Sequence, residues 1–159
     1  MGETHKSYTV EEAKRKLEYY CVYQDRCHDE VYQKLRSLNM IPLAIDTIMA
    51  HLIEHNFLNE ERFACSFARG KFRIKQYGKR RIVQELKFRN ITKYNIDRAL
   101  KEIDEDEYLE VFNQLAEKQW ANITGSSILI KRKKLTDFLI RKGFENQLIS
   151  DKVYALAHQ

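Results

Sequence analysis

Residues 58–91 of the chain read LNEERFACSFARGKFRIKQYGKRRIVQELKFRNI, and the prediction of the whole fold follows from the pattern of this stretch. It predicts two helices separated at Gly78, because apolar residues recur at helical spacing on both sides of that glycine. The second half is strongly basic: residues 69–93 contain ten Lys or Arg and one acid, Glu85. The net charge of the whole 159-residue chain is only +5, so the positive charge is concentrated here. A basic helical segment with interleaved aromatic residues predicts a surface for a polyanion or an acidic protein groove; the alternative is a solvated helical face.

The apolar pattern of this stretch occurs three times along the chain. A shift of 51 residues, followed by a second shift of 53, superposes apolar residues at six positions. These positions are Val31/Ile82/Leu135, Leu35/Leu86/Leu139, Met40/Ile91/Phe144, Ile45/Ile96/Ile149, Met49/Leu100/Val153 and Leu52/Ile103/Leu156. The same shifts align Asn39, Asn90 and Gly143, residue types that tolerate the left-handed conformation at the end of a helix. The chain is therefore predicted to contain three copies of a three-helix unit, each with a sharp corner before its third helix.

Composition also favours an all-helical protein. Five Gly and one Pro are too few for many tight turns, while a hydrophobic content of 43% is enough to build a core. We expect three tandem three-helix repeats at residues 9–56, 57–103 and 104–159. Each unit is too small to bury much surface alone, so neighbouring units must share core. The predicted fold is an all-α, elongated and curved array in which the first and third repeats make few contacts.

Helix starts support this division. Thr9 and Glu12 fit a capping box, Pro42 suits a first helical turn, and Asn59 is a good N-cap. With Phe63 taken as the centre of the buried side of its helix, Phe72 falls on the opposite side. Phe72 and Phe88 are therefore predicted to be exposed among cations, although Phe88 could instead pack against a neighbouring repeat.

Two further charged runs lie in the third repeat. Six acids between residues 102 and 110 precede a helix, where they complement the helix macrodipole and could also contact the basic stretch. Residues 131–134 (KRKK) form a second basic patch.

Other classes of function find little support in the sequence. The three cysteines, Cys21, Cys27 and Cys65, lack the spacing of a metal site, and we expect reduced thiols in the cytoplasm. The N-terminal residues show no secretory signal, and no window approaches 18 apolar residues, so a membrane span is not expected. The chain lacks nucleotide-binding glycine motifs and any recognisable nucleophile and base. We therefore expect a non-enzymatic protein without a cofactor or a metal.

The chain resembles the RecX family of bacterial recombinase regulators. The residues that carry the resemblance are 58–64 (LNEERFA), 77–78 (YG), 81–82 (RI), 85–86 (EL) and Ile91, followed by Lys134, Leu135, Leu139 and 141–144 (RKGF). It covers about residues 9–157. Three features depart from the family pattern: residues 26–28 (RCH) replace a serine-containing helix start, Asn39 and Asn90 stand where glycine is common, and Lys79 replaces a frequent proline.

The resemblance implies a monomeric modulator of RecA, the ATPase that forms helical filaments on single-stranded DNA. Such proteins bind within the filament groove, span adjacent protomers, and restrain ATP hydrolysis, strand exchange and repressor cleavage; some also bind DNA directly. The expected partner is the RecA filament, joined by single-stranded DNA as in those members that bind DNA directly, and no membrane is expected. We assign the binding surface to Arg69, Lys71, Phe72, Arg73, Lys75, Lys79, Arg80, Arg81, Lys87, Phe88, Lys131 and Arg132, the two phenylalanines serving as apolar anchors or stacking platforms.

Two alternatives remain open. The short corners also suit helix-turn-helix geometry, which would make the chain a nucleic-acid-binding protein without an effect on RecA. A helical-repeat scaffold for a different protein would show neither activity.

Overall fold

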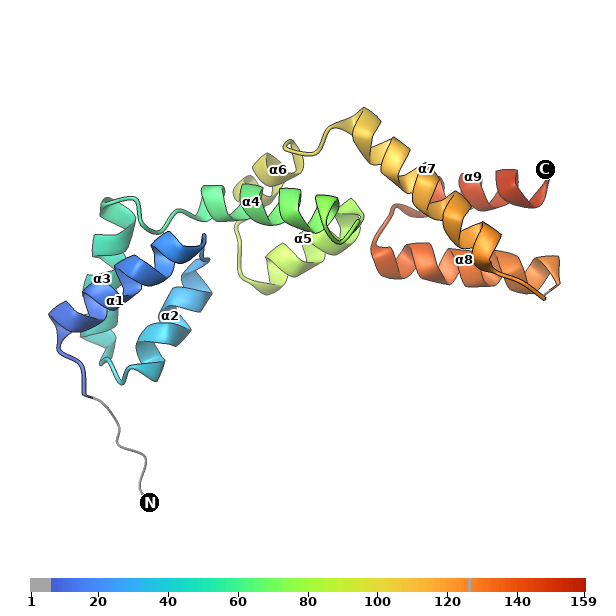
Figure 1. Cartoon of the computed structure of the whole chain (residues 1–159). Helices are drawn as coiled ribbons and strands as arrows, with labels where there is room; N and C mark the ends of the chain where they lie inside the picture. Colours follow the sequence, from blue (N-terminus) through green and yellow to red (C-terminus); the bar gives the residue numbers. More distant parts are fainter. Residues whose placement is uncertain (1–6, 126) are drawn as a thin grey trace, which may run out of the picture.

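The computed structural model describes residues 7–125 and 127–159, which form nine α-helices and no strand. The helices are α1 (Val10–Tyr23), α2 (His28–Ser37), α3 (Pro42–Glu54), α4 (Glu60–Arg73), α5 (Lys79–Phe88), α6 (Lys93–Leu100), α7 (Glu105–Asn122), α8 (Ile128–Lys142) and α9 (Asn146–Ala157). Taken in threes, they follow one another along an elongated, bent array with α4–α6 in the middle (Figure 1). The all-α prediction is confirmed. We call the three groups repeats one, two and three, and their exact boundaries stay predictions.

Local sequence signals set the helix starts. At α1, the N–H of Glu12 donates to Thr9 Oγ1 at 3.1 Å, and the Thr9 N–H donates to the Glu12 side chain at 3.2 Å, which completes the predicted capping box. Pro42 occupies the first turn of α3. The Asn59 side chain accepts the N–H of Arg62 at 2.9 Å and caps α4.

The three corners adopt the predicted left-handed conformation. The φ angles are 61° at Asn39, 59° at Asn90 and 96° at Gly143. Each corner therefore turns the chain from the second helix of its repeat into the third.

Two apolar clusters, rather than one continuous core, hold the array together. One cluster lies within repeat one and includes Leu58 at the start of the next repeat. The other spans repeats two and three, and the buried Cys27 of repeat one belongs to it. The prediction of a shared core thus holds fully for repeats two and three, whereas Cys27 is the only described residue of repeat one that joins that core.

Polar contacts complete the joint between repeats one and two. The Asp25 carboxylate accepts from Arg62 Nε at 2.8 Å and from Ser66 Oγ at 2.9 Å. The Asn90 side chain donates to the Asp29 carboxylate at 2.7 Å. Side chains therefore make most of this joint.

Backbone groups also join repeats two and three, in addition to the shared core. The N–H groups of Gly78 and Arg80 donate to the carbonyls of Lys142 and Gly143 at 2.8 and 2.9 Å. A Cβ atom on Gly78 would lie 2.3 Å from the Gly143 oxygen, so this close approach requires glycine. The first turn of α5 has no side-chain cap of its own and is capped by the end of α8.

No helix among the described residues has both the length and the apolar character to cross a membrane.

Candidate partner-binding surface

A groove of about 1070 Å³ lies where α5 meets the corner between α8 and α9; we call it the basic groove. Its lining residues are Lys79, Arg80, Arg81, Val83, Gln84, Glu85, Lys87, Leu100, Ile140, Arg141, Gly143, Phe144 and Glu145. Because the backbone hydrogen bonds of Gly78 and Arg80 hold α5 against α8, both walls of the groove are fixed relative to each other.

Four of the predicted binding residues line this groove, but they differ in how free they are. Arg80 and Lys87 are exposed, and their side chains form no ion pair or hydrogen bond within residues 7–125 and 127–159. Arg81 stacks on the Tyr77 ring, with its guanidinium carbon 3.8 Å from the ring centroid, and donates to a backbone carbonyl of α8 at 3.0 Å. Lys79 is half-buried and paired with Glu105. Arg80 and Lys87 are therefore the predicted cations that remain available to a partner here.

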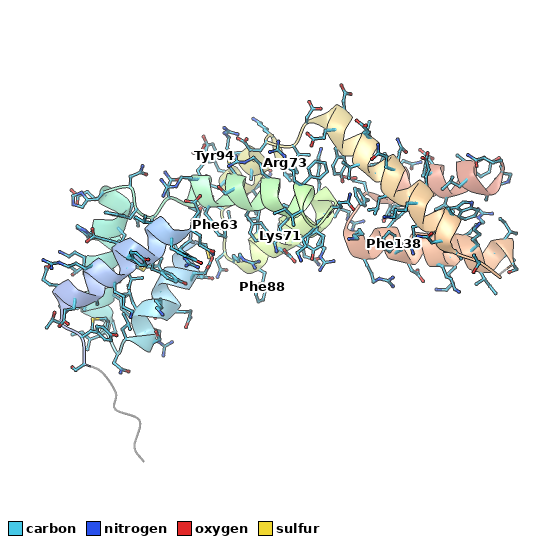
Figure 2. All side chains as sticks on the ribbon, viewed as in Figure 1. Phe63, Lys71, Arg73, Phe88, Tyr94 and Phe138 are labelled. Atoms are coloured by element: carbon cyan, nitrogen blue, oxygen red, sulfur yellow. The ribbon has the colours of Figure 1, made fainter. Side chains whose placement is uncertain are left out.

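The predicted cations of α4 lie outside this groove. Arg69 pairs with Glu102 at 3.1 Å, and Lys71 lies over the rings of Phe67 and Tyr77 at 5.3 and 5.8 Å. Arg73 is exposed, as is Lys75. Figure 2 shows Arg73 and Phe88 on opposite sides of repeat two. The structure therefore divides the predicted basic surface instead of bringing it together on one face.

The prediction that Phe72 is exposed is wrong. Only 2% of this residue is accessible, and its ring centroid lies 5.7 Å from that of Tyr108 on α7. A helical wheel assigns one buried side to a helix, but α4 packs against its own repeat on one side and against repeat three on another. Phe72 is therefore part of the core between these repeats and cannot anchor a partner.

Phe88, by contrast, is exposed as predicted. It is 84% accessible, which excludes the alternative that it packs against a neighbouring repeat. It lies at a second hollow, of about 510 Å³, between α2 and the end of α5, together with Tyr20, Lys34 and Arg89. Figure 2 shows Phe88 projecting from the edge of repeat two.

The second basic patch lies further along α8. Lys131 is half-buried, with its ammonium 4.2 Å from the centre of the Trp120 ring. Arg132 lines a hollow of about 440 Å³ between α8 and α9, and Ile140 lines both this hollow and the basic groove. The patch is thus connected to the basic groove through Ile140.

The acidic run caps a helix and also pairs with the basic stretch, the two roles that the sequence allowed. The Asp104 side chain caps α7, while Glu102 binds Arg69 and Arg98 at 3.1 and 2.9 Å. The hydrogen bond from Arg98, followed by that from Arg69, lowers the pKa of the Glu102 carboxyl. Glu105 neutralises Lys79 in the same way. Two of the predicted binding cations are therefore engaged within the chain.

Sequence reasoning missed Arg141 and Ile140 as residues of the surface. Arg141 is exposed, and its side chain has no partner within the described ranges. Its position two residues before the corner glycine gave no signal of a partner surface, because only the docking of α8 onto α5 places it in the lining of the basic groove.

Nothing among the described residues indicates a metal or redox site: no group of three or more His, Cys, Asp or Glu is placed to hold an ion. All three cysteines are buried free thiols. Burial raises the pKa of Cys21 and of Cys27 to about 11, so both stay protonated at neutral pH.

The family models and the relatives that match this chain are all described as RecX. The family model for the second three-helix domain of RecX matches residues 59–100, and that for the third matches residues 105–153. Regulatory protein RecX of Bacillus cytotoxicus is 28% identical over 130 residues, covering 82% of this chain and 48% of the relative. The protein of the same name from Enterococcus faecalis is 29% identical over 140 residues, covering 88% and 53%. The chain thus spans about half the length of these curated relatives.

Solved structures show the same fold. The crystal structure of RecX from Lactobacillus salivarius superposes with a TM-score of 0.81 at 26% identity, covering 94% of this chain and 97% of that one. A second structure, of a regulatory protein RecX, matches with a TM-score of 0.77 at 21% identity, which supports the fold alone. Two domain models along the chain and a shared fold over nearly its full length lead to one conclusion: the chain belongs to the RecX family.

Proposed function

We propose that this protein binds the RecA–single-stranded DNA filament through the basic groove and inhibits its ATPase, strand-exchange and coprotease activities. Membership of a family of regulatory proteins supports a regulatory role. The observation that carries the choice of surface is the gathering of three unpaired cations, Arg80, Lys87 and Arg141, around one groove between repeats two and three.

The shape of the molecule suits a repetitive partner. A filament presents the same groove at every protomer, and an elongated array can reach more than one of them (Figure 1). Modest contacts at two sites then combine through effective concentration. The unpaired cations would also steer association with an acidic surface or an exposed phosphate backbone.

The decisive experiment is RecA ATPase on single-stranded DNA, titrated with this protein at two salt concentrations and with the order of addition varied. Inhibition that persists when the protein is added to preformed filaments supports filament binding. Inhibition seen only when the protein meets DNA before RecA would instead mean competition for DNA.

A second candidate function is direct binding of nucleic acid without an effect on RecA. The exposed ring of Phe88, between Lys87 and Arg89, favours it, because one stacked base contributes about 1–3 kcal/mol. This function predicts binding to naked single strands with log K falling by roughly 0.7 per neutralised phosphate as log salt rises, and an unchanged RecA ATPase.

The oligomeric state, the location and the cofactor requirement of the protein complete the proposed function. We propose that it acts as a monomer in the cytoplasm, where a RecA filament would form, and that it needs neither a cofactor nor a catalytic residue. Sedimentation of the free protein and of its mixture with filaments tests the monomeric state.

A further inference from the structure

The accessible part of the floor of the basic groove is aliphatic. Val83 and Leu100 are half-buried beside it, and Phe144 is buried beneath it. Ile140 is 52% exposed although it lies between charged residues of α5 and α8. Ile140 therefore adds exposed aliphatic area to a groove that Val83, Leu100 and Phe144 also line.

Cations outnumber acids in the lining of the groove, and its exposed charged residues are cations. Arg80, Lys87 and Arg141 lack partners within the described residues. Of the two acids of the lining, Glu145 accepts the hydroxyl of Tyr108 at 2.8 Å, and Glu85 lies 3.7 Å from Arg81, while its Oε2 atom is buried and has no hydrogen-bond partner among the described residues. The available charge of the groove is therefore positive.

We propose that the basic groove receives an acidic, amphipathic segment of a partner protein, with an aliphatic side chain on Ile140 and carboxylates on the rim. The inference rests on the proposed function in one respect: RecA, rather than its DNA, supplies this segment. A sugar–phosphate backbone would match the rim but leave the aliphatic floor uncovered, and the floor exposes no aromatic face for base stacking. Arg beside an apolar core is typical of protein–protein interfaces.

The groove is also preformed. Backbone hydrogen bonds at Gly78 and Arg80 fix α5 against α8, and Arg81 is held by the ring of Tyr77. Because little ordering is needed when the segment docks, more of the contact energy appears as affinity.

The first test compares two substitutions that leave the charge unchanged. Ile140→Ser removes the aliphatic contact, and Ile74→Ser makes the same change at a residue of repeat two that is 80% exposed and outside the groove lining. Affinity is measured by fluorescence anisotropy for RecA assembled on an oligo(dT) strand and for the same strand alone. We expect I140S to weaken filament binding about tenfold and leave oligo(dT) binding unchanged, and I74S to change neither.

A second test detects the segment directly. A helical peptide with Glu and Leu alternating on one face is titrated into protein labelled at isoleucine methyl groups, and the Ile140 methyl resonance should shift saturably. If I140S leaves filament affinity unchanged, or if the peptide leaves the resonance unmoved, the proposal is overturned. Equal losses for filament and oligo(dT) in Arg80→Gln/Lys87→Gln, with I140S silent, would assign the groove to nucleic acid.

A result that contradicts the proposed function can be distinguished from one that contradicts the acidic-segment proposal. If the wild-type protein does not bind RecA filaments but the peptide still shifts Ile140, the groove binds acidic helices and RecA is not the partner.

Discussion

The backbone N–H of Gly78 donates a hydrogen bond of 2.8 Å to the carbonyl of Lys142, so the start of α5 in repeat two is capped by the end of α8 in repeat three. The positive end of one helix dipole thereby meets the negative end of another. This contact lies next to Lys79 and Gly143 of the basic groove and holds the two repeats together.

Gly78→Ala should destabilise the protein. The added Cβ would lie 2.3 Å from the Gly143 oxygen and 2.4 Å from the Phe144 nitrogen, and because both of these are backbone atoms, neither can move aside easily. We expect a loss of about 1–3 kcal/mol in the free energy of unfolding, measured by urea denaturation.

Gly70→Ala is the matched control. Gly70 lies within α4, and a Cβ there would meet nothing within 4 Å. Replacing a helical glycine by alanine should raise stability by about 0.5–1 kcal/mol. Equal stability of the two variants would show that the repeats are not held as closely as described.

Tyr108→Phe should loosen the same joint. The Tyr108 hydroxyl accepts the N–H of Lys79 at 3.0 Å and donates to the Glu145 carboxylate at 2.8 Å. Tyr108 is buried, so removing its hydroxyl leaves the Lys79 N–H and the Glu145 carboxylate without this partner, at a cost of about 1–3 kcal/mol. Denaturation should show this loss, while Tyr94→Phe, at an exposed residue of α6, should be neutral. A neutral Tyr108→Phe would mean that water replaces the hydroxyl.

Stability should fall as the pH rises from 9 to 11. Burial raises the pKa of the Cys27 thiol from 9.0 to about 11. Between these values the unfolded chain loses the proton while the folded chain keeps it, so the unfolded state binds fewer protons and stability decreases with pH. The denaturation midpoint measured across this range should fall less steeply in Cys27→Ala than in the wild type. Parallel slopes would show that Cys27 does not contribute.

The sequence predicted those parts of the molecule that depend on local chemistry. Asn39, Asn90 and Gly143 mark the corners because few residue types accept the left-handed conformation, and Thr9 starts α1 because its hydroxyl caps it. Packing between repeats was not predictable in this way. The groove exists because the corner at Gly143 docks on α5, and a pattern that repeats within each unit carries no information about which surfaces of adjacent units meet.

Charge reversal in the basic groove should weaken inhibition of RecA more than charge reversal at Arg73, although the sequence predicted that both positions bind the partner. Arg80→Glu/Lys87→Glu should raise the concentration for half-inhibition of RecA ATPase at least tenfold, because both cations are unpaired on the basic groove. Arg73→Glu should have a smaller effect, since Arg73 lies outside that groove. The control is Arg15→Glu/Lys118→Glu, which reverses two exposed cations of other helices. Equal inhibition by the groove variant and its control would remove the basic groove from the binding surface.

Phe72 and Phe88 were both predicted from the sequence to be exposed, but substituting them should have opposite effects on stability. Phe72 fills the core between repeats two and three, so Phe72→Ala should cost about 3–5 kcal/mol of stability. Phe88→Ala removes an exposed ring and should leave the denaturation midpoint unchanged.

If Phe88 stacks on a base or anchors a partner, its substitution should weaken binding to filaments or to oligo(dT) by about 1–3 kcal/mol, measured by anisotropy. Phe88→Leu keeps apolar area without an aromatic face, so restored binding in that variant would identify an apolar anchor, whereas a persistent loss would identify stacking.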